Sequence, residues 1–415
     1  MERRRNAVYI IITLSLLAGL ATGRSFFFNV AYAFGGLLIF SLLWAWSGVN
    51  WLRLNRQTRA RRAQVGRYLE ERFTVQNTGI LPKLWLEFYD QSTLPGHHAG
   101  HVVSGLRPRG ADWWLARTLC LQRGEYRLGP IQVVTGDPFG FFHIERTISA
   151  TSRLIVYPPI VPIAEFTLPI GVLPGGDALR RRTHYITANA SGVRDYAPGD
   201  SFNRIHWRST ARKNRLIVKE FELDPLADIW IMLDAERAAH GGSYGLSPID
   251  EEEIQQQRLW IPPTTEEYAV AIAASLAVHF LRKERSVGFV AHGQRREMIQ
   301  VDRGGRQLTK ILETLAVVRA EGALPLDHLL TLESDQLVRG ATVIVITPST
   351  REDWVAAAHR LTQRGVRVIA VLLDARSFGG RPGIDQIALQ LAMIRVPAYI
   401  IRKDDDISVS LSRAL

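Results

Sequence analysis

The chain has 415 residues, which is enough for two or three domains, each with its own hydrophobic core. Its composition, 47% hydrophobic and 22% charged, is that of a globular protein with a surplus of apolar residues. A single cysteine, Cys120, excludes a disulfide-stabilised scaffold and fits a reducing compartment. The formal net charge is +11, but no nucleic-acid-binding motif accompanies it, so we expect no nucleic-acid partner.

The apolar surplus lies in two runs at the N-terminus. Residues 8–23 read VYIIITLSLLAGLATG, and residues 26–52 read FFFNVAYAFGGLLIFSLLWAWSGVNWL. About 20 apolar residues cross the hydrocarbon core of a bilayer, so the second run is long enough and the first lies near the lower limit. A signal peptide does not fit, because a second apolar run follows the first almost at once. We expect a transmembrane helical hairpin within residues 1–62, rather than one anchor and one buried helix.

Arginines on both sides of this hairpin predict its orientation. Only Arg24 lies between the two runs, whereas the flanks hold a larger set: Arg3, Arg4, Arg5, Arg53, Arg56, Arg59, Arg61 and Arg62. The positive-inside rule therefore places both ends of the hairpin, and the rest of the chain, in the cytoplasm. We expect a multi-pass protein of the cell membrane. Its basic flanks would contact membrane lipids, with roughly 1 kcal/mol gained per basic residue from anionic headgroups.

The middle of the chain has two parts. Residues 63–160 contain several short strand-like segments, such as YLEERFTVQNTG and WWLARTLCLQ, separated by turn signals. This spacing predicts a small β-sandwich. The prolines of LIVYPPIVPI then favour a linker over a central strand. Residues 161–226 carry few regular signals, and we interpret them as a linker with a polar signature segment.

Residues 227–415 alternate between two patterns. Apolar, mostly β-branched runs lie at residues 227–234, 286–292, 341–347, 366–373 and 396–402. Helical patterns lie between them at residues 264–283, 306–320 and 351–365. This alternation predicts a doubly wound α/β domain with a parallel sheet covered on both faces. No phosphate-binding glycine loop follows the first strand, so we expect no nucleotide site.

The densest polar stretch, residues 192–222, reads GVRDYAPGDSFNRIHWRSTARKNRLIVKEFE. A turn and a short helix would place Arg204, Arg208 and Arg212 on one helical face, where like charges need partners or a ligand. The favoured interpretation is a salt-bridge network that joins two domains. A recognition surface for an acidic partner remains open, because guanidinium groups match carboxylates. The residues of this candidate site are Arg194, Asp195, Asp200, Arg204, His206, Trp207, Arg208, Arg212, Lys219 and Glu220.

This stretch resembles the signature of the domain of unknown function 58 family. Residues 122–130 (QRGEYRLGP) and 136–142 (GDPFGFF) are similar to the pieces that precede it in that family. The resemblance implies a von Willebrand factor A-like fold for residues 227–415, no enzymatic activity, and a functional link to MoxR-type AAA+ ATPases. We therefore expect a membrane-anchored cytoplasmic scaffold or adaptor that works with such an ATPase.

Von Willebrand A domains often bind a divalent cation through Asp-x-Ser-x-Ser after the first strand, and this chain departs from that pattern. Asp234 matches, but Glu236 and Ala238 occupy the serine positions, and Thr347 stands where the fourth strand would supply an aspartate. Mg²⁺ needs hard oxygen ligands in octahedral geometry, so we expect a degenerate site and no cofactor. A cation-dependent protein-binding module built on Asp234 is an alternative. The candidates for the distant threonine of the pattern are Thr264 and Thr265.

Two further constellations contain reactive residue types. Asp200, His206 and Ser209 have the residue types of an acyl-transfer triad, which leaves a hydrolase as the alternative function. No nucleophile-elbow sequence surrounds Ser209, so we expect no enzyme. The loop PGHHAGH holds three histidines, but a loop rich in glycine and proline fixes no ligand geometry, and we expect a solvated turn rather than a metal site. These histidines are His97, His98 and His101.

Overall fold

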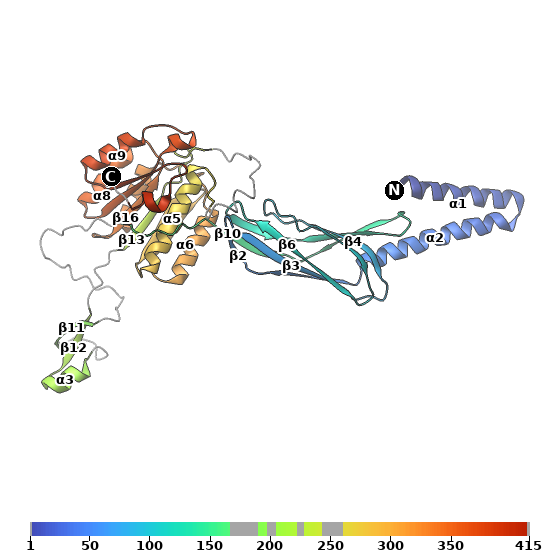
Figure 1. Cartoon of the computed structure of the whole chain (residues 1–415), viewed down its shortest axis with the longest axis horizontal. Coiled ribbons are helices and arrows are strands. Elements are labelled where there is room, and N and C mark those ends of the chain that lie inside the picture. Colours follow the sequence, from blue (N-terminus) through green and yellow to red (C-terminus); the bar gives the residue numbers. More distant parts are fainter. Residues whose placement is uncertain (1, 167–189, 197–204, 222–227, 243–259, 413–415) are drawn as a thin grey trace. The chain divides into compact units, whose positions relative to one another are not determined.

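The computed structural model describes residues 2–166, 190–196, 205–221, 228–242 and 260–412. The chain forms two compact units. One holds the residues up to 159 together with two short later segments, and the other holds most of the remaining chain. Figure 1 shows the helices and strands of each unit.

The first unit begins with a pair of apolar helices, α1 (Glu2–Thr22) and α2 (Ser25–Val49), which pack against each other. Both are long and apolar enough to cross a membrane by length and composition. Gly23 joins them with a left-handed φ of 68°, which glycine adopts without steric cost. The expected pair of N-terminal apolar helices is confirmed.

The end of α2 is attached to the β-rich region by two cationic side chains, which we call the helix-end clamp. The last carbonyl groups of a helix have no intrahelical partners. The Lys83 ammonium donates to the carbonyls of Ser47 and Asn50, the second at 3.2 Å. Arg146 Nη1 donates to the carbonyl of Val49 at 3.1 Å. The clamp therefore satisfies the helix end with groups that belong to two different strands.

Close packing also joins the end of α2 to the β-rich region. Gly48, in the last turn of α2, faces Thr135, and a Cβ at Gly48 would collide with that side chain. The absence of a side chain on Gly48 lets α2 approach the sheet closely.

The β-rich region consists of three sheets. The first has the order β1 (Leu52–Thr58), β3 (Tyr68–Asn77) and β6 (Ala111–Leu119). The second has the order β5 (His101–Leu106), β4 (Lys83–Asp90), β8 (Ile131–Gly136) and β9 (His143–Ile148). The third has the order β2 (Arg62–Gln64), β10 (Ser152–Tyr157) and β7 (Gly124–Leu128). Because β1 pairs with β3 along its whole length, sheet structure begins before residue 63, where the sequence predicted the region to start.

The first two sheets share one hydrophobic cluster. Alternate residues of β3, such as Phe73 and Val75, point into it, as the strict alternation of buried and exposed positions on this strand requires. Phe73 stacks on Trp114 of β6, with ring centroids 5.1 Å apart. Phe88 and Val133 of the second sheet belong to the same cluster.

A buried ionic network lies beside this cluster. Arg56 Nη2 is 2.7 Å from Glu71 Oε2 and 2.9 Å from Asp90 Oδ2, and His97 Nε2 is 2.9 Å from the same Asp90 oxygen. At most 3% of each of the four side chains is exposed. Hydrogen bonds from His97 and Ser92 and the charge of Arg56 hold the pKa of Asp90 below its usual value, against the effect of burial. The expected solvated turn is therefore wrong at His97, whose ring is buried among the charged groups of Arg56, Glu71 and Asp90 from three strands.

Arg56→Ala should lower the local free energy of unfolding of the β-rich region by about 3–5 kcal/mol, because Glu71 and Asp90 would remain buried without their cation. Hydrogen exchange of the β3 amides in the full-length protein measures this energy. Arg59→Ala is the matched control, since Arg59 is 83% exposed in its pair with Glu70 and an exposed pair contributes only about 0–1 kcal/mol. Equal effects of the two substitutions would contradict a stabilising network.

The second unit contains a six-stranded sheet with the order β15 (Arg296–Asp302), β14 (Val287–His292), β13 (Ile229–Leu233), β16 (Thr342–Thr347), β17 (Arg367–Leu373) and β18 (Ala398–Ile401). The five strands predicted from apolar runs are parallel. The edge strand β15 is antiparallel, and the sheet is therefore mixed. The prediction of an α/β domain is confirmed, but β15 was missed.

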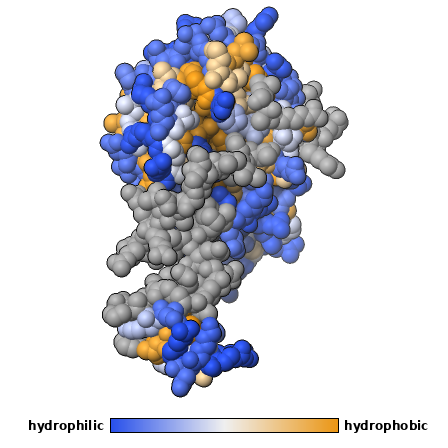
Figure 2. Space-filling model, turned by 90° about the vertical axis from the view of Figure 1, so that its left-hand side faces the viewer, coloured by the Kyte–Doolittle hydropathy of each residue, from blue (hydrophilic) through white to orange (hydrophobic). Residues whose placement is uncertain are grey.

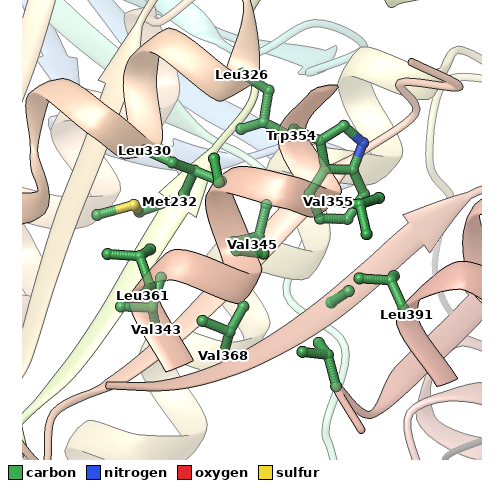
Figure 3. Close-up of a cluster of buried hydrophobic side chains, with 14 of the residues drawn as sticks. Met232, Leu326, Leu330, Val343, Val345, Trp354, Val355, Leu361, Val368 and Leu391 are labelled. Carbon is green, nitrogen blue, oxygen red and sulfur yellow. The ribbon is translucent and has the colours of Figure 1, made fainter. Parts of the chain in front are cut away.

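Six helices accompany the sheet in the described part of this unit: α5 (Thr265–Arg282), α6 (Gly305–Val317), α7 (Leu326–Leu332), α8 (Asp353–Gln363), α9 (Ile384–Met393) and α10 (Ile407–Ser410). Two 3₁₀ turns lie at Ser334–Gln336 and Ala375–Phe378. Figure 3 shows the core between the sheet and α7, α8 and α9, where Trp354 and Leu361 of α8 pack over Val343, Val345 and Val368. α5 contacts β13, β14, β16 and β17.

A third group of secondary-structure elements lies, in the sequence, between the β-rich region and the six-stranded sheet. β11 (Ala190–Asp195) pairs with β12 (Ile217–Phe221) in antiparallel fashion, and α3 (Trp207–Lys213) lies between them in the chain. The predicted short helix followed by a strand is present, but the helix begins only at Trp207, because Ile205 forms a bridge with Val218 and His206 is the N-cap. The prediction had also placed Arg204 in this helix. The predicted turn at Pro198 and Gly199 lies outside the described residues.

Candidate functional site

Two places carry the residues that the sequence singled out, and the first is the carboxyl edge of the α/β sheet. β13 and β16 are neighbours, with Leu233 paired with Ile346, so the residues that follow meet at one edge. Thr347 Oγ1 donates to Asp234 Oδ2 at 2.6 Å, and the Glu236 amide donates to Asp234 Oδ1 at 3.0 Å. Both carboxylate oxygens of Asp234 therefore already accept hydrogen bonds from the protein.

The electrostatics of this edge disfavour negative charge. Asp234 is 1% exposed, and burial raises its pKa, against the opposing effects of His240, Thr347 and the Glu236 amide. Burial and the neighbouring Asp234 raise the pKa of Glu236 as well. Arg351 Nη1 lies 3.7 Å from Glu236 Oε1, while Glu236 Oε2 is buried with no hydrogen-bond partner among the described residues. Glu236 thus shares the Arg351 guanidinium group with Asp353, which lies 3.1 Å from Arg351 Nη2.

These residues border a pocket of about 670 Å³. Its wall comes from the segments that follow β13, β16 and β17, the usual place for ligands in an open α/β sheet. The ionisable side chains that line it are Glu236, His240, Arg351 and Arg381.

The cation-binding pattern implied by the family resemblance does not fit this geometry. Ala238 offers no ligand atom, Glu236 faces Arg351, and Thr347 uses its hydroxyl proton to bond Asp234. Thr264 caps α5 by accepting from the Glu267 amide at 3.2 Å. We derive no role for a metal from this arrangement.

Sequence reasoning missed His240. Its Nε2 donates to the Asp234 carbonyl at 2.8 Å, and its Nδ1 lies 3.1 Å from Thr265 Oγ1. Thr265 also accepts from the Gly241 amide at 2.9 Å, so the predicted ligand Thr265 holds the loop after β13 instead of facing the Asp234 carboxylate. No sequence signal marks His240, because a histidine six residues after Asp234 belongs to no known ligand spacing.

The second place is α3, whose Arg208, Arg212 and Lys213 are exposed; we call these three residues the basic face of α3. Trp207 beside them is 66% exposed. Figure 2 shows the group of β11, α3 and β12 at its lower end, where most of the visible surface is hydrophilic with a small apolar patch. Arg215, which the prediction did not include, pairs with Asp195 at 3.1 Å, and both side chains are 60% exposed. Such an exposed pair contributes about 0–1 kcal/mol.

Several predicted members of this site stay predictions. Asp200 and Arg204 lie outside the described residues. Arg194, Lys219 and Glu220 belong to the backbone pairing of β11 with β12, and their side chains lie outside what the structure describes.

The predicted nucleophile and base are in contact, but as a helix cap. His206 Nδ1 lies 2.6 Å from Ser209 Oγ and accepts from the Ser209 amide at 3.2 Å. A side chain that accepts from an amide in the first turn is what an N-cap residue does. The third member of the predicted triad, Asp200, is among the residues that the structure does not describe.

Comparison with known proteins agrees with the sequence resemblance for part of the chain. Residues 192–378 match the family model described as "Protein of unknown function DUF58". This range includes α3 and β12 and the sheet strands from β13 to β17. The chain is also 23% identical over 270 residues to the uncharacterized protein YeaD of Bacillus subtilis (strain 168). That match covers 62% of this chain and 60% of YeaD, so it spans less than two thirds of the relative.

Solved structures show only a weak likeness. The conserved hypothetical protein BatB from Bacteroides thetaiotaomicron is 12% identical, with a TM-score of 0.32 over 45% of this chain and 95% of that one. The open conformation of the pilus adhesin SpaC from Lactobacillus rhamnosus GG is 8% identical, with a TM-score of 0.31 over 46% of this chain and 29% of that one. TM-scores at this level carry no conclusion about fold or function.

Substitutions of Asp234 test the metal-free interpretation of the sheet edge. Asp234→Ala should lower stability by about 1–3 kcal/mol, because the Thr347 hydroxyl and the Glu236 amide lose their acceptor. Asp234→Asn keeps an acceptor and removes the charge, so it should cost less. Because the pKa of Asp234 is raised in the fold, wild-type stability should fall as the pH rises from the unfolded pKa of about 3.9 through the folded one, and Asp234→Asn should weaken this fall. Thermal unfolding of the full-length variants between pH 4 and pH 8 measures both effects.

Thermal unfolding of the wild-type protein with added Mg²⁺ or Mn²⁺ serves as the control. We expect almost no change in the thermal midpoint. An ion at a hundredfold excess over its Kd would stabilise the protein by about 2.7 kcal/mol. A gain of that size, lost in Asp234→Ala, would show that Asp234 binds a cation after all.

Proposed function

We propose that this protein is a membrane-anchored cytoplasmic adaptor that binds an acidic segment of a partner through the basic face of α3. The observation that carries the proposal is the exposure of Arg208, Arg212 and Lys213 on one capped helix. Arg208 and Arg212 are one helical turn apart, so their charges repel by a few tenths of a kcal/mol until a negative group lies between them. A bound carboxylate removes this repulsion.

The chemistry of this face suits a protein partner. A guanidinium group binds a carboxylate through two parallel hydrogen bonds, which fixes orientation as well as charge. Trp207, 66% exposed next to the arginines, adds a large apolar contact. Arginine and tryptophan are the residue types that most often dominate binding energy at protein interfaces.

The membrane anchor and the orientation have their own support. α1 and α2 are long and apolar enough to span a bilayer, and arginines flank both of their outer ends. The positive-inside rule then places the β-rich region and the α/β domain in the cytoplasm. In this compartment an ATP-driven partner has access to α3.

The identity of the partner rests on the family resemblance. We propose a MoxR-type AAA+ ATPase, with the α/β domain as a von Willebrand factor A-like module. The strand order, with β13 central and one antiparallel edge strand, supports such a doubly wound module. The protein itself would have no enzymatic activity. A hydrolase based on His206 and Ser209 is the competing function, favoured by their contact of 2.6 Å.

Capture from membranes tests this function. The full-length protein should retain an ATPase partner in an ATP-dependent way, and Arg208→Ala combined with Arg212→Ala should weaken capture about tenfold or more, which corresponds to about 1.4 kcal/mol or more. The loss should be sensitive to salt, because the contact is between exposed charges. The thermal midpoint should stay near that of the wild type, as is usual for exposed substitutions.

Arg360→Ala combined with Arg364→Ala is the matched control, because these arginines are also exposed and one turn apart, on α8 and its C-cap. Unchanged capture by the α3 variant, or an equal loss in the α8 control, would overturn the assignment of the basic face. A large fall in thermal midpoint in the α3 variant would favour the salt-bridge network instead. Labelling of Ser209 by a serine-reactive probe would favour the hydrolase.

A further inference from the structure

We infer that the end of the β-rich region next to α2 is a lipid-facing surface that lies in the headgroup layer of the same bilayer that α1 and α2 cross. This inference rests on the proposed membrane anchoring and goes beyond it, because it assigns part of the extramembrane fold to the membrane surface. The side chains involved, which we call the interfacial surface, are Trp46, Trp51, Ile80, Leu81 and Phe139.

These side chains are large, apolar and exposed. Ile80 is 79% exposed, Trp46 50%, Trp51 48%, Phe139 44% and Leu81 39%. They come from four separate segments of one unit: the end of α2, the residue before β1, the β3–β4 loop and the β8–β9 loop. Single exposed apolar residues are ordinary, but a group of them at one end of a folded region marks an interaction site.

The loop that carries Ile80 and Leu81 is held in a fixed shape. Asn77 is fully buried, and its Nδ2 donates to the carbonyls of Leu81 and Arg107, at 2.8 and 3.1 Å. Its Oδ1 accepts from the Gly79 amide at 3.0 Å. A buried amide side chain therefore presents Ile80 to the outside, and Ile80 is not exposed through loose packing of the loop.

A buried carboxylate likewise fixes the shape of the segment 136–142. This segment is the GDPFGFF motif, to which the proposed function gives no role. Asp137 is 5% exposed and accepts from the amides of Phe139 and Phe142, at 2.9 and 2.6 Å. Phe139 then points outward and stacks with Phe141 at a centroid distance of 5.9 Å. Two loops thus use buried polar side chains to hold apolar side chains in contact with the surroundings.

The backbone of Trp51 is also held in a conformation that leaves its side chain exposed. It has a left-handed φ of 56°, which is sterically unfavourable for a non-glycine residue. Thr78 holds it in place, because its amide and its hydroxyl both donate to the Trp51 carbonyl, at 2.7 and 2.8 Å. The ring meets Trp46 edge to face at 5.4 Å and remains half exposed. A ligand that contacts the exposed Trp51 ring would account for this backbone strain.

The lengths of the segments place this surface at the level of the headgroups. α2 has 25 residues, about 37 Å at 1.5 Å per residue, whereas the hydrocarbon core is about 30 Å thick. The excess of about 7 Å, little more than one turn, lets the last turn of α2 extend into the headgroup layer. β1 starts at Leu52, directly after Trp51, and the helix-end clamp holds α2 against β4 and β9. The loops beside the clamp cannot move away from the membrane surface without breaking it.

The charges nearby fit an anionic bilayer. Arg4, Arg53, Arg107 and Arg109 are exposed at this end of the unit. Each of these side chains is attracted to anionic headgroups. Tryptophan beside basic residues is the composition found at membrane interfaces. A protein partner would have to displace lipid from a surface that α2 itself joins to the bilayer, so we assign the surface to lipid.

Spin labels at single introduced cysteines test the inference in the full-length protein, in vesicles of phosphatidylglycerol and phosphatidylcholine. Burial raises the pKa of the native Cys120 thiol to about 11, and this thiol is fully buried, so it does not compete for the label. Labels are placed at Ile80 and Phe139, with Leu115 as the matched control, since it is 60% exposed but lies four residues, about 13 Å, along β6 from the end at Ala111. Ile39 of α2, 63% exposed and ten residues, about 15 Å, before the end of the helix, reports the anchor.

The ratio of collisions with oxygen to collisions with a water-soluble nickel chelate increases with depth in the bilayer. We expect this ratio to be highest at Ile39, intermediate at Ile80 and Phe139, and lowest at Leu115, with a severalfold difference between the last two groups. A ratio at Ile80 and Phe139 equal to that at Leu115, with Ile39 still deep, would overturn the interfacial surface and leave the anchor intact. A low ratio at Ile39 would overturn the anchor itself.

Discussion

The carbonyl groups at the end of α2 must keep hydrogen-bond partners where the chain leaves an apolar helix and enters a β-sheet. Lys83 and Arg146 supply these partners from β4 and β9. Lys83 is 2% exposed, and burial lowers the pKa of its ammonium group, so the contact is made by a cation that has left water for carbonyl oxygens. The cation over the Trp51 ring, 5.7 Å from its centroid, adds to the same junction. This clamp makes α1, α2 and the β-rich region one mechanical unit.

The same constraint, that a buried charge needs a partner, explains the other polar centres. In the β-rich region Arg56 lies between Glu71 and Asp90. Together with His97, these two carboxylates have the composition of a metal site, but the group that they surround is the Arg56 guanidinium. At the α/β sheet edge Asp234 is satisfied by a hydroxyl and an amide. The basic face of α3 is the opposite case, because its charges are exposed to solvent.

Much of the fold could be predicted because its pattern is local. β13, β14, β16, β17 and β18 are continuous apolar runs, as strands buried on both faces require. β15 was missed because its sequence REMIQVD mixes polar and apolar residues, as an antiparallel edge strand does. The site was less predictable, because its contacts join distant residues. His97 meets Arg56 across 41 positions, and Asp234 meets Thr347 across 113, so no spacing rule reveals them.

The most direct test of the account is the rigidity of the junction between α2 and the β-rich region. Spin labels at Leu43 of α2 and Leu115 of β6, both well exposed, report the distance between the two parts by pulsed electron resonance in vesicles. A narrow distance distribution is expected for the wild-type clamp, and a clearly broader one for Lys83→Met combined with Arg146→Met. A broad distribution in the wild-type background, or an equally narrow one without the two cations, would contradict the claim that the clamp fixes the β-rich region to α2.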